Sequence, residues 1–146
     1  MEEQYTEQEE GEKAGDLAED LAQEVHAIAE YSRGQAIRDG VLVDVSEIAR
    51  ECGFRYPVAV TARVWSEVLT PDRQARLDGQ CKAGRLWDVL GMLRAAIRHT
   101  TGAAGVLTYK VFVRIGGKFQ ERILKAVCGP GDKGEPVITV MMLEED

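Results

Sequence analysis

The spacing of apolar residues changes from a helical to a strand period near residue 100, and this change limits the folds open to the chain. Between Gln80 and His99, apolar side chains recur every three or four residues, which predicts a long amphipathic helix. From Leu107 to Ile115, apolar and polar residues alternate, which predicts a half-buried strand. Helical patterns that precede strand patterns are typical of an α+β fold.

The strand pattern continues beyond Ile115. Two glycines follow it and predict a hairpin, for which we favour a three-residue loop that pairs Ile115 with Phe119. The second strand then runs to Cys128, and a third returns over 137–143. Upstream, residues 58–69 follow a proline and are predicted to be helical. We therefore expect α+β architecture, with N-terminal helices packed on a C-terminal three-stranded antiparallel β-meander.

Charge divides the chain into an acidic start and a mildly basic body. The chain has 25 acidic and 18 basic residues. Residues 1–30 hold eleven of the acids and one of the bases, so the rest of the chain has 14 acids and 17 bases. Residues 1–15 are predicted to be a disordered acidic leader, because they have too little apolar area to offset chain entropy. Residues 16–30 are predicted to form an amphipathic helix, and 31–146 a single α+β domain. The apolar face of that helix predicts self-association or partner binding through Leu17, Leu21, Val25 and Ile28.

Several sequence segments, taken together, resemble one protein family. They are YSR at 31–33, DGVLVDVS at 39–46, GFRYPVA at 53–59, GRLWDVL at 84–90, LKAVCGPGD at 124–132 and GEPVIT at 134–139. The chain resembles the DUF6573 family, small bacterial proteins of unknown function found among plasmid, integrative-element and phage genes. The resemblance spans about residues 31–146 and leaves the leader and first helix outside it. It implies a mobile-element or phage setting and assigns no catalytic or binding residue.

Two further short helices are predicted, one between Ser32 and Gly40 and one between Ser46 and Gly53, and their corners carry side chains typical of protein interfaces. Tyr31, Arg33, Arg55 and Tyr56 lie next to predicted helix boundaries, and aromatic and arginine residues are enriched in binding hot spots. Asp132 lies in a loop rich in glycine and proline, and loops on rigid scaffolds often bind partners. An alternative is that these residues pin the short helices to the sheet. Our leading prediction is a non-enzymatic accessory protein that binds another protein and modulates host or replicon machinery.

The first alternative is single-stranded nucleic-acid binding through a face of the sheet. With the three-residue loop, the predicted hairpin places Lys110, Phe112, Arg114 and Arg122 on one face. The cations would contact phosphates while the phenyl ring stacks on an unpaired base. An ordinary solvated face with one aromatic residue gives the same pattern.

The second alternative is a metal-dependent hydrolase that uses dispersed aspartates. Asp44, Asp88 and Asp132 carry carboxylates, which are ligands for hard cations. Their positions show no ligand spacing, so we predict neither a metal site nor a cofactor.

The longest apolar runs are far shorter than a membrane span, and the first residues lack the pattern of an export signal. Three cysteines at wide spacing, Cys52, Cys81 and Cys128, are typical of reduced thiols. We expect a cytoplasmic protein without a membrane partner.

Overall fold

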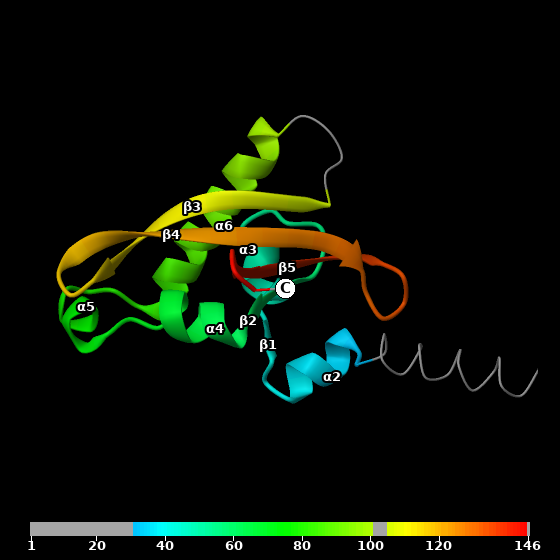
Figure 1. Ribbon diagram of the computed structural model, residues 1–146, viewed down its shortest axis with the longest axis horizontal. Helices are drawn as coiled ribbons and strands as arrows, with labels where there is room; N and C mark the ends of the chain where they lie inside the picture. The colour runs from blue at the N-terminus through cyan, green and yellow to red at the C-terminus, as the bar shows by residue number, and fades with distance from the viewer. Residues whose placement is uncertain (1–30, 101–104, 146) are drawn as a thin grey trace, which may run out of the picture.

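The computed structural model describes residues 31–100 and 105–145 (Figure 1). Its helices are α2 (Arg33–Arg38), α3 (Ser46–Glu51), α4 (Ala62–Val64), the π-helix η1 (Trp65–Leu69), α5 (Arg73–Leu77) and α6 (Lys82–His99). Its strands are β1 (Leu42–Asp44), β2 (Val58–Thr61), β3 (Val106–Ile115), β4 (Lys118–Pro130) and β5 (Pro136–Met142). The predicted leader and the predicted helix over 16–30, with Leu17, Leu21, Val25 and Ile28, lie outside these residues. Within the described ranges, no helix has the length and apolar content needed to cross a bilayer.

The α+β class is confirmed, but the sheet is not the predicted three-stranded antiparallel meander. Five strands pair in the order β1-β2-β5-β4-β3, and the sheet is mixed because β2 and β5 run parallel, with Val58 opposite Ile138. The missed strand, β2, occupies the first four residues of the helix predicted over 58–69, whereas 62–69 are helical as α4 and η1. Its residues Val58, Ala59 and Val60 are fully buried, and a short apolar run of this kind fits a buried strand or helix equally well.

The hairpin between β3 and β4 has a two-residue loop, so the predicted three-residue loop is wrong. Gly116 and Gly117 have φ values of 58° and 78°, as a primed two-residue turn requires. Ile115 therefore pairs with Lys118 rather than with Phe119. Because side chains alternate along a strand, this shift of one residue moves every β4 side chain to the opposite face from the one predicted.

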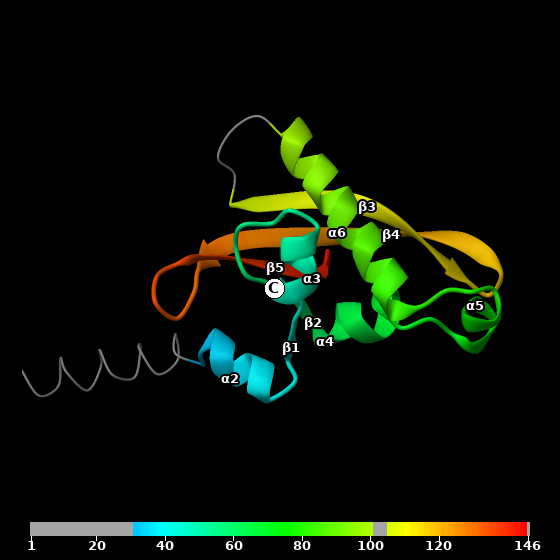
Figure 2. The same ribbon diagram turned by 180° about the vertical axis from the view of Figure 1, so that it is seen from behind.

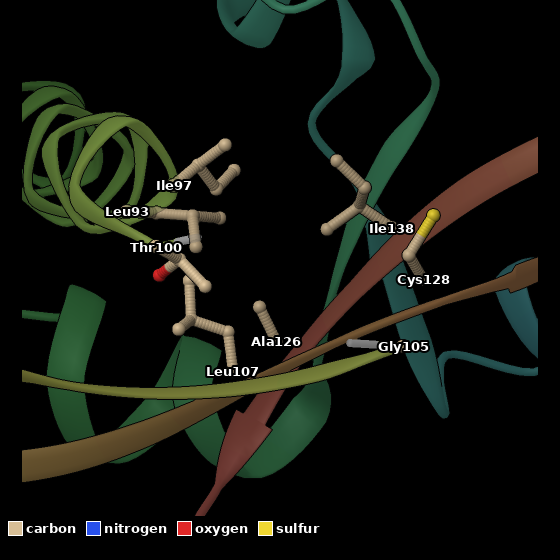
Figure 3. Close-up of a pocket in the computed structure, with 8 residues that line it drawn as sticks. All are labelled: Leu93, Ile97, Thr100, Gly105, Leu107, Ala126, Cys128 and Ile138. Atoms are coloured by element: carbon tan, nitrogen blue, oxygen red, sulfur yellow. The ribbon is translucent and has the colours of Figure 1, made fainter. Parts of the chain in front are cut away.

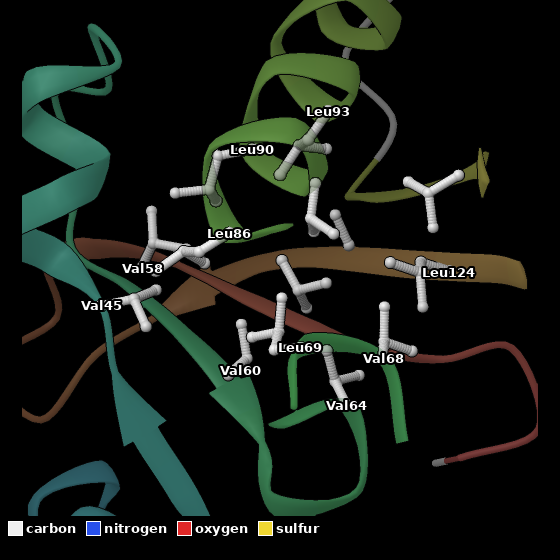
Figure 4. Close-up of a cluster of buried hydrophobic side chains, with 14 of the residues drawn as sticks. Val45, Val58, Val60, Val64, Val68, Leu69, Leu86, Leu90, Leu93 and Leu124 are labelled. Carbon is white, nitrogen blue, oxygen red and sulfur yellow. The ribbon is translucent and has the colours of Figure 1, made fainter. Parts of the chain in front are cut away.

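The main core lies between α6 and one face of the sheet. Figure 2 shows α6 in front of β3 and β4, and Figure 1 shows it behind them. The amphipathic helix predicted between Gln80 and His99 is confirmed, because Leu90 and Leu93 of α6 are fully buried, as is Leu124 of β4 (Figure 4). Each such leucine contributes about 2 kcal/mol by leaving water. This burial fixes which face of the sheet stays uncovered.

A buried arginine ties α6 to its neighbours. Arg85 is 3% exposed and donates to the main-chain oxygens of Val68 (3.1 Å) and Thr70 (3.4 Å). It also donates to the main-chain oxygen of Arg114 near the end of β3. A charged donor shared among carbonyls offsets the cost of burying the guanidinium, and burial lowers the pKa of Arg85.

The hairpin loop is anchored by an aspartate. Asp72 caps α5 by accepting from the N–H of Ala75 (2.7 Å), and its other oxygen accepts from the N–H of Gly116 (3.1 Å). These two bonds favour the ionised carboxylate and lower the pKa of Asp72. The carboxylate therefore joins α5 to the far end of the hairpin.

Candidate interaction surface

The sheet has a second face, which no helix of the described residues covers across the middle of β3 and β4. We call it the open face, and it consists of Val106, Thr108, Lys110, Phe112 and Arg114 of β3 with Phe119, Glu121, Ile123, Lys125 and Val127 of β4. Their neighbours along β3, the buried residues Tyr109, Val111 and Val113, point into the core. The two figures of the whole molecule show α6 only on that core side. The open face is thus the outer surface of the long hairpin.

Large apolar side chains gather on the open face. Phe112 is 60% exposed, Phe119 is 70% exposed and Ile123 is 37% exposed. Phe112 pairs with Glu121, so Phe119 and Ile123 are its diagonal neighbours on β4, within reach of an aromatic ring. We call these three residues the apolar patch. Exposed apolar groups gathered in this way mark interaction sites more often than single ones do.

The cations of the open face already have partners within the chain. The Nζ of Lys110 lies 3.5 Å from Oε1 of Glu121, and the Nε of Arg114 lies 3.5 Å from Oδ2 of Asp78. The Arg114 guanidinium also lies 5.6 Å from the centre of the Phe119 ring, a cation–π contact. The charge at the centre of this face is therefore largely balanced.

The structure separates one member of the predicted nucleic-acid site from the others. Lys110, Phe112 and Arg114 share the open face as predicted, but Arg122 pairs with Val111 and lies on the opposite face. There it donates to the main-chain oxygen of Glu121 (3.0 Å). The cause is the two-residue loop. It shifts the pairing of β4 by one residue, so that Phe119 lies on the open face and Arg122 does not.

Two of the predicted interaction residues hold α2 against the sheet. Asp132 accepts from the N–H groups of Arg33 (2.9 Å) and Gly34 (3.0 Å) at the start of α2. The Arg33 guanidinium donates to Oγ1 of Thr139 (2.6 Å) and to the main-chain oxygen of Ile138 (2.6 Å). These bonds agree with the alternative that such residues pin a short helix to the sheet.

The other three predicted interaction residues lie on connecting segments. Tyr31 is exposed and donates its hydroxyl to Oδ2 of Asp39 (2.9 Å), a bond that raises the pKa of the phenol. Arg55 and Tyr56 are exposed between α3 and β2. Their role in binding stays a prediction.

The three dispersed aspartates do not form a metal site. In residues 31–100 and 105–145, no three His, Cys, Asp or Glu side chains lie close enough together to hold a metal ion. Asp44 accepts from the N–H of Ser46 (3.0 Å) and from its hydroxyl, and Asp88 is exposed on α6. Asp132 binds the start of α2 instead.

A small apolar pocket lies between the C-terminal end of α6 and the strands (Figure 3). It encloses about 120 Å³, and its lining is Leu93, Ile97, Thr100, Gly105, Leu107, Ala126, Cys128 and Ile138. Its polar side chains are the Thr100 hydroxyl and the free Cys128 thiol, which do not form a catalytic pair. The pocket therefore offers packing space without a reactive arrangement.

Sequence reasoning missed Phe119 and Ile123 as surface residues and assigned both to the buried row. The signal that identifies them is the Gly116-Gly117 pair, which favours a primed two-residue turn over a longer loop. Applying that turn places both side chains beside Phe112 without any structure.

The family DUF6573, described as a family of unknown function, matches residues 19–146. The match begins earlier than the expected start near residue 31 and takes in most of the predicted helix over 16–30. Residues 19–30, which fall in the segment predicted to be helical, are therefore part of the region that defines the family. No curated protein and no solved structure matches the chain.

Proposed function

We propose that this chain, which belongs to the DUF6573 family of unknown function, is a non-enzymatic domain whose open face binds a protein partner. The observation that carries this proposal is the apolar patch, with two phenyl rings mostly exposed on an uncovered sheet face. A partner that covers both rings gains about 2 kcal/mol from each. Such aromatic anchors are the usual centre of a protein interface.

The charge of the open face favours a protein over a nucleic acid. Binding to a phosphate backbone relies on several free cations, whereas Lys110 and Arg114 each lie beside a carboxylate. Arg122, a third cation proposed for that role, lies on the other face. Single-stranded nucleic acid remains the alternative, because Phe112 offers a stacking surface for one base.

The wider setting of this function comes from the family resemblance and the sequence. A plasmid or phage origin, a cytoplasmic location and a partner in host or replicon machinery stay predictions. A second group of residues of the types enriched in protein interfaces lies apart from the hairpin in sequence, and it consists of Tyr31, Arg55 and Tyr56.

The test uses a photoreactive phenylalanine analogue placed at Phe119 in the source cells. Leu77 on α5 is the matched control, because at 72% exposure it is as accessible as Phe119. We expect a protein adduct from position 119 that position 77 does not give and that Phe112→Asp abolishes. An adduct that nuclease digests would favour the nucleic-acid alternative. The absence of any position-dependent adduct would contradict both.

A further inference from the structure

The described chain begins on the same side of the sheet as the open face. Arg33, two residues after the first described residue Tyr31, reaches Oγ1 of Thr139. Thr139 alternates with Ile138 and Val140, which point into the core, so its side chain lies on the opposite side. The described chain therefore begins on the side of the open face, at the end nearest the loop between β4 and β5, where Asp132 accepts from the N–H of Arg33.

The length of that segment matches the length of the open face. Residues 16–30 form a helix of about 22 Å if they adopt the predicted conformation. Thr139 pairs with Val127, and from Val127 to Glu121 the strand β4 extends about 20 Å. Glu121 pairs with Phe112, so a helix that ends near Thr139 and runs back along β4 reaches the apolar patch at Phe112.

The chemistry of the segment complements that of the face. Its apolar residues recur on one helical side over about 16 Å, and they are Leu17, Leu21, Val25 and Ile28. The segment 16–30 holds five acids and no Lys or Arg. On the open face, Lys110 pairs with Glu121 and Arg114 pairs with Asp78, so Lys125 is the one cation in excess over these carboxylates. Lys125 donates to the main-chain oxygen of Glu145, which is a neutral acceptor.

We propose that residues 16–30 dock as a helix on the open face, with their apolar side on Phe112, Phe119 and Ile123. The family match supports this, because it includes residues 19–30 together with the sheet. A partner that binds the open face then displaces the segment. Only this displacement rests on the proposed function, whereas docking stands on the geometry alone.

The test is amide hydrogen exchange on the full chain, followed over 16–30. We expect exchange at least tenfold slower than in a free peptide of the same residues. The double variant Phe112→Glu with Phe119→Glu should restore the peptide rate, whereas Leu77→Glu, an equally exposed apolar position on α5, should not. Circular dichroism of each variant checks that the sheet remains folded.

Three results would overturn docking. The first is a wild-type segment that exchanges at the peptide rate, and the second is slow exchange that survives the double phenylalanine variant. The third is slow exchange that appears only as concentration rises with a dimer mass in sedimentation, which would assign the occupant to a second copy. Crosslinking from position 119 tests the protein partner separately. A protein adduct without slow exchange over 16–30 would contradict docking alone. Slow exchange without a protein adduct would contradict only the proposed partner.

Discussion

The two faces of the sheet both carry large apolar side chains, but only one of them excludes water. On the covered face, Leu124 of β4 is fully buried, together with Leu90 and Leu93 of α6, which pack against that face. On the open face, Phe112 and Phe119 keep most of their surface exposed. Burial supplies most of the free energy of folding, so the covered face holds the domain together while the open face is free to bind. Substitutions on the two faces should therefore separate folding from binding.

The largest effect is expected from Leu90→Ala on the covered face. Removing a fully buried leucine side chain leaves a cavity, and the free energy of unfolding should fall by about 4 kcal/mol. Urea unfolding measures this. Leu77→Ala, at an exposed leucine, is the control and should change it by less than about 0.5 kcal/mol. Equal losses at both positions would break the contrast between covered and exposed apolar residues.

Arg85→Met should lower the free energy of unfolding by about 3 kcal/mol, because the carbonyls of Val68, Thr70 and Arg114 lose their charged donor. Arg94→Met is the matched control on the same helix. Arg94 is exposed and donates to one carbonyl, that of Cys52 (2.8 Å), so its loss should cost about 1 kcal/mol. Chemical denaturation compares the two, and a larger cost at position 94 would contradict the role given to Arg85.

Asp132→Ala should destabilise α2 by about 1 kcal/mol, because the first N–H groups of that helix lose their acceptor. The effect should be local, with faster amide exchange over 33–38 and little change in α6. Asp88→Ala, at an exposed aspartate on α6, serves as control. Unchanged exchange in α2 would show that Asp132 is free for another role.

A pH-dependent effect is expected at Asp72. Its N–H donors Ala75 and Gly116 hold its pKa below the ordinary value of 3.8. The stabilisation is therefore present above that value and is lost as pH falls through the lower pKa of the folded state. Unfolding of wild type and Asp72→Asn should differ at about pH 5 and converge towards about pH 2. A difference that stays constant across this range would contradict the assignment.

The smallest change in stability is expected from Phe119→Ser on the open face. Its ring is largely exposed among the described residues, so the sheet domain itself should lose less than about 0.5 kcal/mol, apart from the docking of residues 16–30 that amide exchange measures. Partner crosslinking from a photoreactive residue at Phe112 should nevertheless be lost. A large loss of stability would show that the open face is part of the core and that the two faces do not separate folding from binding.

The elements with one strong periodicity could be predicted from the sequence. The helix predicted over 80–99 is found as Lys82–His99, and the strand predicted over 107–115 as Val106–Ile115. In both cases a single side faces the core, so the apolar spacing reports the structure directly. The failures arise where this signal is weak. β2 is buried on both sides, and its pairing with β5 joins Val58 to Ile138 across a separation that no local pattern encodes.

The candidate site was predictable in part. Lys110, Phe112 and Arg114 follow from alternation along β3 and lie on one face as expected. The prediction of which β4 side chains share that face depended on whether the hairpin loop has two or three residues. The longer loop that was predicted assigned each β4 side chain to the wrong face. The ion pairs that balance the charge come from Glu121 and Asp78, and the second of these lies on a different element, beyond the reach of sequence spacing.

The central place of β5 has a consequence for biosynthesis. It is the last of the five strands to leave the ribosome, yet it lies between β2 and β4. All four strands of the β1–β2 pair and the β3–β4 hairpin therefore precede, along the chain, the strand that joins them. Until β5 inserts between them, each pair presents an unpaired sheet edge, to which a chaperone or another chain is able to bind.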